Sequence, residues 1–189
     1  LLLMGNDSTL YKSKDNTSLE CELTGEVINE HSYLLQIQNE PGQVAVTLVF
    51  KQILSYYRGN YEGAAELSDQ TQGYTEKYGK IFFQGVRYAF FDGLTALAML
   101  QKNTGYRNNR KWLKRKSNSM KKMSTWKGKG NVNVIHMLLL LQAEEYTLER
   151  KIDMNLARSK FDAAIAIAGK AGFANDSALA NERAGAFCS

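Results

Sequence analysis

The chain has 189 residues, of which 44% are hydrophobic and 23% are charged, and a formal net charge of +5, which is the composition of a soluble globular protein. Its longest strongly apolar run, residues 134–141, is far shorter than the ~20 residues that span a bilayer, so we expect no transmembrane segment. Two cysteines, Cys21 and Cys188, do not form a disulfide framework, which favours a reducing, cytoplasmic location.

The first 40 residues are polar and show only weak periodicity. We expect residues 1–40 to be a poorly ordered N-terminal segment or the tail of a preceding element. The dipeptide Pro41-Gly42 marks a clear break after them. The fold predicted for residues 41–189 is all-α, a tetratricopeptide-like α-solenoid of antiparallel helix pairs.

The first predicted pair comprises helices at Gln43–Arg58 and at Tyr61 to about Tyr78. Apolar side chains at steps of three and four give the first of them a buried face. Gly59 stands where such a repeat has its turn glycine. Ala64 stands at the first small position of the second helix.

The next predicted helix, Ile81–Lys102, is the most apolar in the chain. Gly85 and Gly93 are eight residues apart, so they share one side of this helix. Without a Cβ atom, both positions allow a partner helix to approach closely.

The predicted helix from Tyr106 to about Trp126 is unusually basic. No Asp or Glu occurs from Gly93 to Ala143, and eleven Lys or Arg lie from Lys102 to Lys129. The apolar side of this amphipathic helix is predicted to hold Trp112, Leu113, Met120, Met123 and Trp126. The wet side, a candidate surface for an anionic partner, is predicted to hold Arg107, Arg110, Lys111, Lys114, Arg115, Lys121 and Lys122.

This basic surface has two interpretations. In the first, it contacts an acidic domain of the same polypeptide, another anionic partner, RNA or a membrane surface. In the second, it is a solvated outer face that pairs with acidic residues of the preceding helix pair. Nucleic acid is the less favoured partner, because base-stacking motifs and recognised nucleic-acid folds are missing from the sequence.

A third predicted pair, Asn133–Arg150 and Asp153–Ala168, organises the C-terminal region. Its second helix has the spacing A-x3-F-x2-A, which is the second-helix pattern of a tetratricopeptide-like repeat. In the preceding pair, Lys116 stands at the position where the repeat pattern has a small residue, so this position departs from the pattern. The residues predicted to pack the repeats are Ala64, Gly85, Gly93, Trp112, Met120, Ala143, Ala157, Phe161 and Ala164.

The last residues predict the opening helix of a fourth pair. Gly169 and Gly172 are candidates for the left-handed end of the preceding helix. Asn175, Asp176 and Ser177 are candidates to cap the new helix. A first helix without its partner leaves an apolar face uncovered, so we expect the chain to be a piece of a longer array.

Four runs carry a resemblance to a known family. The first is Trp112 to Trp126, and the others are N-x-x-H-x-x-L-L-L-x-A-E from Asn133, A-x-x-x-F-D-x-A-I-x-x-A-x-x-x-G-F from Ala157, and A-L-A-N-E-x-A-G-x-F from Ala178. The chain resembles the helical-repeat region of large multidomain signalling proteins. In that family a serine/threonine kinase-like module and a STAND-type AAA ATPase module precede the repeats. A GAF sensor with a histidine kinase, or a nucleotide cyclase, follows them.

The resemblance implies a connecting, interaction or autoregulatory array whose partners are other domains of the same polypeptide or other proteins. It carries over no catalytic residue, because the family's catalytic modules lie outside this region. Cys188 stands where such repeats often have tyrosine.

Motifs for catalysis, for cofactor binding or for a metal site are missing from the sequence. There is no G-x-x-x-x-G-K-[ST] loop, and no metal-ligand spacing surrounds His136, which we interpret as a residue packed between helices. Asp92, Glu144 and Glu145 are expected to be solvated or to cap helices. We therefore predict a non-enzymatic scaffold or interaction segment without cofactor or metal. The alternative is a module that binds RNA or acidic lipid through helix 106–126.

Overall fold

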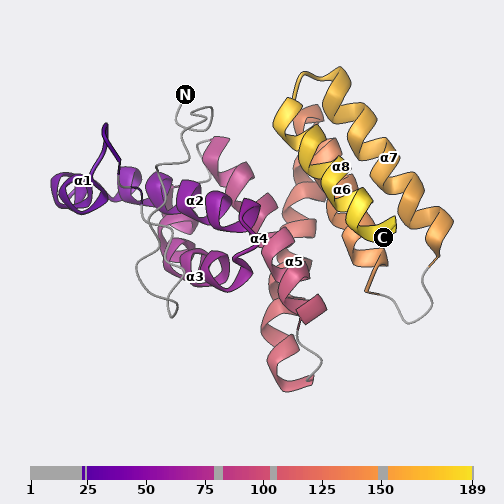
Figure 1. The fold of residues 1–189 in the computed structure, drawn as a ribbon, viewed down its shortest axis with the longest axis horizontal. Helices are drawn as coiled ribbons and strands as arrows, with labels where there is room; N and C mark the ends of the chain where they lie inside the picture. Colours follow the sequence, from indigo (N-terminus) through magenta and orange to yellow (C-terminus); the bar gives the residue numbers. More distant parts are fainter. Residues whose placement is uncertain (1–22, 24, 79–82, 103–105, 149–152, 189) are drawn as a thin grey trace. The chain divides into compact units, whose positions relative to one another are not determined.

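Every regular element of the computed structural model is helical within the part of the chain that it describes (Figure 1). The described residues are 23, 25–78, 83–102, 106–148 and 153–188. The all-α prediction is confirmed for these residues, whereas residues 1–22 of the predicted N-terminal segment lie outside them. The chain divides into two compact units, Leu1–Gly85 and Val86–Ser189. Among the helices in the described ranges, none combines the length and the apolar character needed to cross a bilayer.

The first unit contains α1 (Glu30–Ile37), α2 (Pro41–Tyr57) and α3 (Tyr61–Tyr78). The side-chain oxygen of Asn29 accepts a hydrogen bond from the Ser32 amide at 3.0 Å and so caps α1. Pro41 occupies the first turn of α2, where its missing N–H would have no helical partner. Gly59 adopts a φ of 72° between α2 and α3, a left-handed conformation that suits glycine.

Helices α2 and α3 pack closely against each other. Apolar side chains of both helices are buried: Val49, Ile53, Tyr56, Ala64, Ala65 and Leu67. The rings of Tyr56 and Tyr61 stand 5.2 Å apart, centroid to centroid, across the turn. Ala64 is completely buried, as a small residue at a helix–helix contact should be.

The second unit contains the part of α4 (Phe83–Lys102) from Val86 onward, followed by α5 (Tyr106–Gly128), a 3-10 turn η2 (Val132–Val134), α6 (Ile135–Tyr146), α7 (Met154–Lys170) and α8 (Ala174–Cys188). The Asp153 side chain caps α7 by accepting from the Leu156 amide at 3.0 Å. Gly172, with a φ of 79°, forms the tight turn between α7 and α8.

Helix α7 packs against both α6 and α8 (Figure 1). Its alanines Ala157, Ala164 and Ala168 are at most 1% exposed, and small side chains there allow the neighbouring helices to approach. Phe161 fills the space between them and lies 5.7 Å from the Phe187 ring of α8, centroid to centroid. Among the described residues of this unit, the other large side chains that are fully buried are Phe90, Phe91, Leu94, Leu97, Met123, Val134, Met137, Leu140 and Leu141.

The predicted helices agree with the observed ones to within a few residues. α3 has the predicted bounds, and α5 extends two residues past the predicted end at Trp126. The predicted helix Asn133–Arg150 is shorter in the structure, because Val132–Val134 forms a 3-10 turn and α6 ends at Tyr146. In the turn before α8, Gly172 has the left-handed conformation, whereas Gly169 lies within α7.

Candidate functional site

The exposed side of α5 carries a row of basic side chains. Arg110, Lys114 and Lys121 are exposed and fall within about 40° of one another on a helical wheel, so they form one stripe, here termed the basic ridge. None of the three makes an ion pair with another described residue. Lys111 and Lys122 are also exposed, beside this stripe. These positions are consistent with a surface open to an anionic partner.

Two of the predicted surface residues differ from the other five. Arg107 lies in α5, but its side chain is outside the described ones. Arg115 was expected on the wet side, and this was wrong, because only 8% of it is exposed. Its Nη2 atom lies 2.8 Å from Asp92 Oδ1. The cause is helical spacing, since Arg115 follows the buried Trp112 by three residues and so lies toward the same side.

The apolar side of α5 is buried as predicted at Trp112 and Met123, and Met120 and Trp126 are half-buried. Leu113 departs from the prediction, because 45% of it is exposed. Trp112 is 8% exposed and is also covered by a cation, since Lys111 Nζ lies 4.6 Å from its ring centroid. Both tryptophans therefore face the protein more than the solvent.

Leu113 lines a hollow of about 430 Å³. The hollow is bordered by Leu100, Asn109, Leu113, Lys116, Glu145 and Leu148. Lys116 Nζ lies 2.5 Å from Glu145 Oε1, so the two charged groups at its wall neutralise each other. This ion pair also explains how a lysine fits at a position where the repeat pattern has a small residue. The Lys116 side chain is half-buried, and its ammonium group contacts the Glu145 carboxylate.

The predicted packing residues are buried, apart from Met120, which is half-buried. Ala143 is buried in α6, and Ala157, Phe161 and Ala164 are buried in α7, whereas Ala64 and Gly85 lie in the first unit. Gly93 marks a close approach of α4 to α5 and α6. A Cβ atom built there would lie 2.9 Å from Leu141 Cδ2 and 3.0 Å from Ser119 Cβ.

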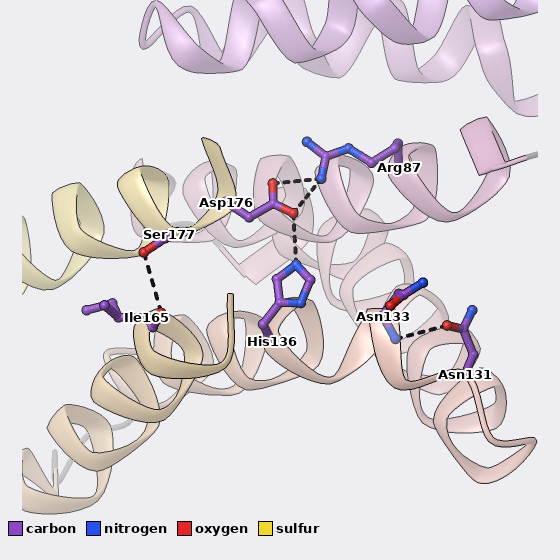
Figure 2. A network of polar contacts seen from close by, with 7 residues as sticks. All are labelled: Arg87, Asn131, Asn133, His136, Ile165, Asp176 and Ser177. Carbon is purple, nitrogen blue, oxygen red and sulfur yellow. Dashed lines mark hydrogen bonds and ion pairs between the residues drawn. The ribbon is translucent and has the colours of Figure 1, made fainter. Parts of the chain in front are cut away.

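The first of three buried polar clusters joins α4, α6 and α8 (Figure 2). Arg87 Nη1 donates to both carboxylate oxygens of Asp176, at 2.7 and 2.8 Å. His136 Nε2 lies 2.8 Å from Asp176 Oδ2, and the His136 ring stacks on Phe173 with centroids 4.7 Å apart. The His136 and Asp176 side chains are only 2% and 3% exposed. The interpretation of His136 as a residue packed between helices agrees with this arrangement.

Asp176 was predicted to cap α8, and the structure corrects this prediction. Its side chain faces Arg87 and His136 because α8 begins at Ala174, which places position 176 on the inner side of the first turn. Burial raises the pKa of this carboxyl, but the His136 hydrogen bond and the Arg87 charge outweigh burial. The pKa of Asp176 therefore lies below its ordinary value of 3.8.

The second cluster surrounds Glu144 of α6. Arg183 of α8 donates from Nε to Glu144 Oε1 at 2.5 Å and from Nη2 to Oε2 at 3.1 Å, which is a bidentate pair. Gln101 of α4 donates to the same carboxylate at 3.2 Å. The Glu144 side chain is 3% exposed, so the expectation of a solvated or capping role for it was wrong.

The third cluster surrounds Asp92 of α4. Besides Arg115, Ser119 of α5 donates from Oγ to Asp92 Oδ2 at 3.3 Å. Asp92 is 8% exposed, which corrects the prediction of a solvated carboxylate. The sequence did contain a signal for this burial, because Asp92 follows the buried Tyr88 and Ala89 by four and three residues and so lies on the same face of the helix. An acidic residue on the buried face of a helix needs a charged or hydrogen-bonding partner. The position of the acid in the sequence does not identify that partner.

The three clusters pair each acid with a base, so they act as specific connections between helices. Across the described ranges, no group of three or more His, Cys, Asp or Glu side chains is placed to hold a metal ion. The absence of a catalytic centre, a cofactor and a metal remains a prediction from the sequence. No family model, curated protein or solved structure matches the chain.

Proposed function

We propose that the chain is a tetratricopeptide-like α-solenoid segment of antiparallel helix pairs, with about three pairs and the opening helix of a fourth. Its role is that of a non-catalytic scaffold in a multidomain signal-transduction protein. It links a kinase-like or ATPase module to an output module such as a histidine kinase or a nucleotide cyclase. The resemblance of residues 131–187 to such proteins is the origin of this proposal.

The observation that carries it is the packing of α7. This helix contacts both α6 and α8, its Ala157, Ala164 and Phe161 are buried, and Phe161 lies against Phe187 of α8. In a solenoid, each repeat contacts its sequence neighbours, and stability is a sum over those contacts. A displacement applied at one end of such a stack is passed on from pair to pair.

The buried charged clusters support a mechanical link, although they join α4 to α8, which belong to helix pairs that are not sequence neighbours. Arg87, Asp176 and His136 connect three helices, and Glu144 with Arg183 connects two of the same three. A buried ion pair that loses its partner is costly, so these contacts resist sliding of one helix along another. Helices held in this way move as a block, which suits a mechanical link.

The coding sequence on either side of the chain is the first test. Kinase, ATPase, GAF or cyclase motifs there would support the proposal. In that longer polypeptide, the chain is then replaced by a flexible Gly/Ser linker of the same length. We expect each module to keep its own activity, while the output ceases to respond to the state of the ATPase module. Unchanged regulation with the linker would contradict the scaffold role.

A second candidate is an anion-binding module for RNA or acidic lipid, which the exposed basic ridge favours. Binding to phosphates releases counterions, so its affinity should fall steeply as salt rises. That dependence should disappear when glutamine replaces the exposed basic residues of α5, which are Arg110, Lys111, Lys114, Lys121 and Lys122. No measurable affinity for RNA or anionic vesicles at about 50 mM salt would eliminate this candidate.

A further inference from the structure

The hollow lined by Leu113 and the basic ridge lie next to each other on α5. Arg110 precedes Leu113 by three residues, which is about one helical turn, and Lys114 follows it directly. Leu113 is the exposed apolar residue of the hollow, and Leu100 and Leu148 are half-buried beside it. A neutral, partly apolar hollow thus adjoins a positive stripe that no described acid neutralises.

We propose that this composite surface binds an acidic amphipathic segment of a protein. One apolar side chain of that segment enters the hollow, and its carboxylates contact Arg110, Lys114 and Lys121. The inference rests on the proposed scaffold function, because it names the chemistry of the partner that the scaffold holds.

Charge complementarity divides the surface into two parts. Lys116 and Glu145 already satisfy each other at 2.5 Å, so the wall of the hollow carries no net charge and suits an uncharged group. Its volume of about 430 Å³ lies within the range of protein pockets and accommodates a leucine-sized side chain. The ridge residues make no ion pair with a described residue, so a carboxylate can contact them without displacing a described acid.

The same observations disfavour RNA and membrane surfaces. Single-stranded RNA is held by exposed aromatic rings on which bases stack, whereas Trp112 is buried and Trp126 half-buried. An amphipathic helix binds a bilayer by inserting its apolar face, but Trp112 and Met123 of α5 are already covered by protein. Among the described side chains of α5, Leu113 is the exposed large apolar residue, which leaves little apolar surface for insertion.

The test uses the full 189-residue chain and two short helical peptides labelled with a fluorophore. The first peptide has glutamates on one face and a single leucine at the border of that face. In the second peptide, serine replaces this leucine. Polyuridylate RNA and phosphatidylserine vesicles serve as the competing probes, and fluorescence anisotropy at low salt gives the dissociation constants.

We expect the leucine peptide to bind about tenfold more tightly than the serine peptide. Changing Arg110, Lys114 and Lys121 together to glutamine should weaken binding of both peptides about tenfold. A matched control, in which the exposed Lys127, Lys129 and Lys170 are changed to glutamine, removes the same charge and should change binding less than about twofold.

The decisive variant is Leu113→Ser, which should abolish the preference for the leucine peptide while leaving the affinity for the serine peptide unchanged. The comparison of the two peptides on the unaltered chain changes only the probe, so it remains valid even if the Leu113→Ser chain folds poorly. Equal binding of both peptides to the unaltered chain would overturn the proposal. Tighter binding of RNA or vesicles, lost with the ridge variant and insensitive to Leu113→Ser, would overturn it in favour of an anion-binding module.

Absence of binding to any probe would overturn the assigned partner. That result is distinguishable from failure of the scaffold role, because the linker replacement measures coupling between modules and uses no peptide. A chain that binds the leucine peptide but is replaceable by a linker would contradict the scaffold role alone.

Discussion

His136 Nε2 lies 2.8 Å from Asp176 Oδ2, although the two residues belong to α6 and α8. Arg87 of α4 contacts both oxygens of the same carboxylate (Figure 2). One carboxylate therefore fixes the register of three helices. Removing it would leave the Arg87 guanidinium without its anion where the side chain is only 17% exposed, and solvent would compensate for the loss poorly.

We expect Asp176→Asn to lower the free energy of unfolding of the second unit by about 3 kcal/mol. The chain's two tryptophans, Trp112 and Trp126, both belong to α5, so their fluorescence during urea denaturation reports on this unit. Asp162→Asn is the matched control, since Asp162 is exposed on α7 and should contribute less than about 0.5 kcal/mol. Equal losses from the two substitutions would show that the cluster does not stabilise the unit.

Acid should weaken the same unit through Asp176. Its pKa in the folded chain lies below the ordinary value of 3.8, so the stabilisation that it provides is fully present above that value. The stabilisation is lost progressively as pH falls below about 3.8 and through the folded pKa. We expect the difference in unfolding free energy between the unaltered chain and Asp176→Asn to narrow over this window. Urea titrations from neutral pH to about pH 2 measure it, and a constant difference would contradict the linkage.

The helices could be predicted because their signals are local. Apolar residues at steps of three and four, together with turn glycines such as Gly59 and Gly172, lie within a few residues of the helix that they define. The bounds of α3 and α7 therefore agree with the prediction closely. The basic ridge was also predictable in outline, because a long stretch without acids has no nearby counterion.

The buried clusters could not be predicted, because their partners come from other helices. Glu144 was expected in solvent, yet it follows the buried Leu140 and Leu141 by four and three residues. That spacing indicates burial, but nothing local points to Arg183 on α8. Likewise, the exposure of Leu113 depends on where the neighbouring helices end. The packing of separate helices sets this exposure, and the sequence around Leu113 does not.

Neighbouring carboxylates of α6 provide a test of burial. Glu144 has a side chain that is 3% exposed and a bidentate arginine, whereas the Glu145 side chain is 34% exposed and pairs with Lys116. We expect Glu144→Gln to lower the free energy of unfolding by about 3 kcal/mol, because Arg183 would lose a buried anion. Glu145→Gln should lower it by less than about 1 kcal/mol, since solvent screens that pair. Urea denaturation followed by tryptophan fluorescence compares them, and similar losses would refute the assignment of Glu144 to the interior.

Replacing two helical glycines with alanine distinguishes the effect of helix propensity on stability from the effect of packing. Gly93 is within α4, and an added Cβ atom would lie 2.9 Å from Leu141 Cδ2 and 3.0 Å from Ser119 Cβ. Gly185 is within α8, and a Cβ atom added there would meet no neighbouring side chain within 4 Å. Alanine favours a helix over glycine by about 1 kcal/mol, so Gly185→Ala should raise the free energy of unfolding by up to that amount. Gly93→Ala should instead lower it by about 1–3 kcal/mol, because α4 would be forced away from α5 and α6. Urea denaturation followed by tryptophan fluorescence measures both changes. If Gly93→Ala stabilised the unit as Gly185→Ala does, the helices would not meet at Gly93 as closely as this structure places them.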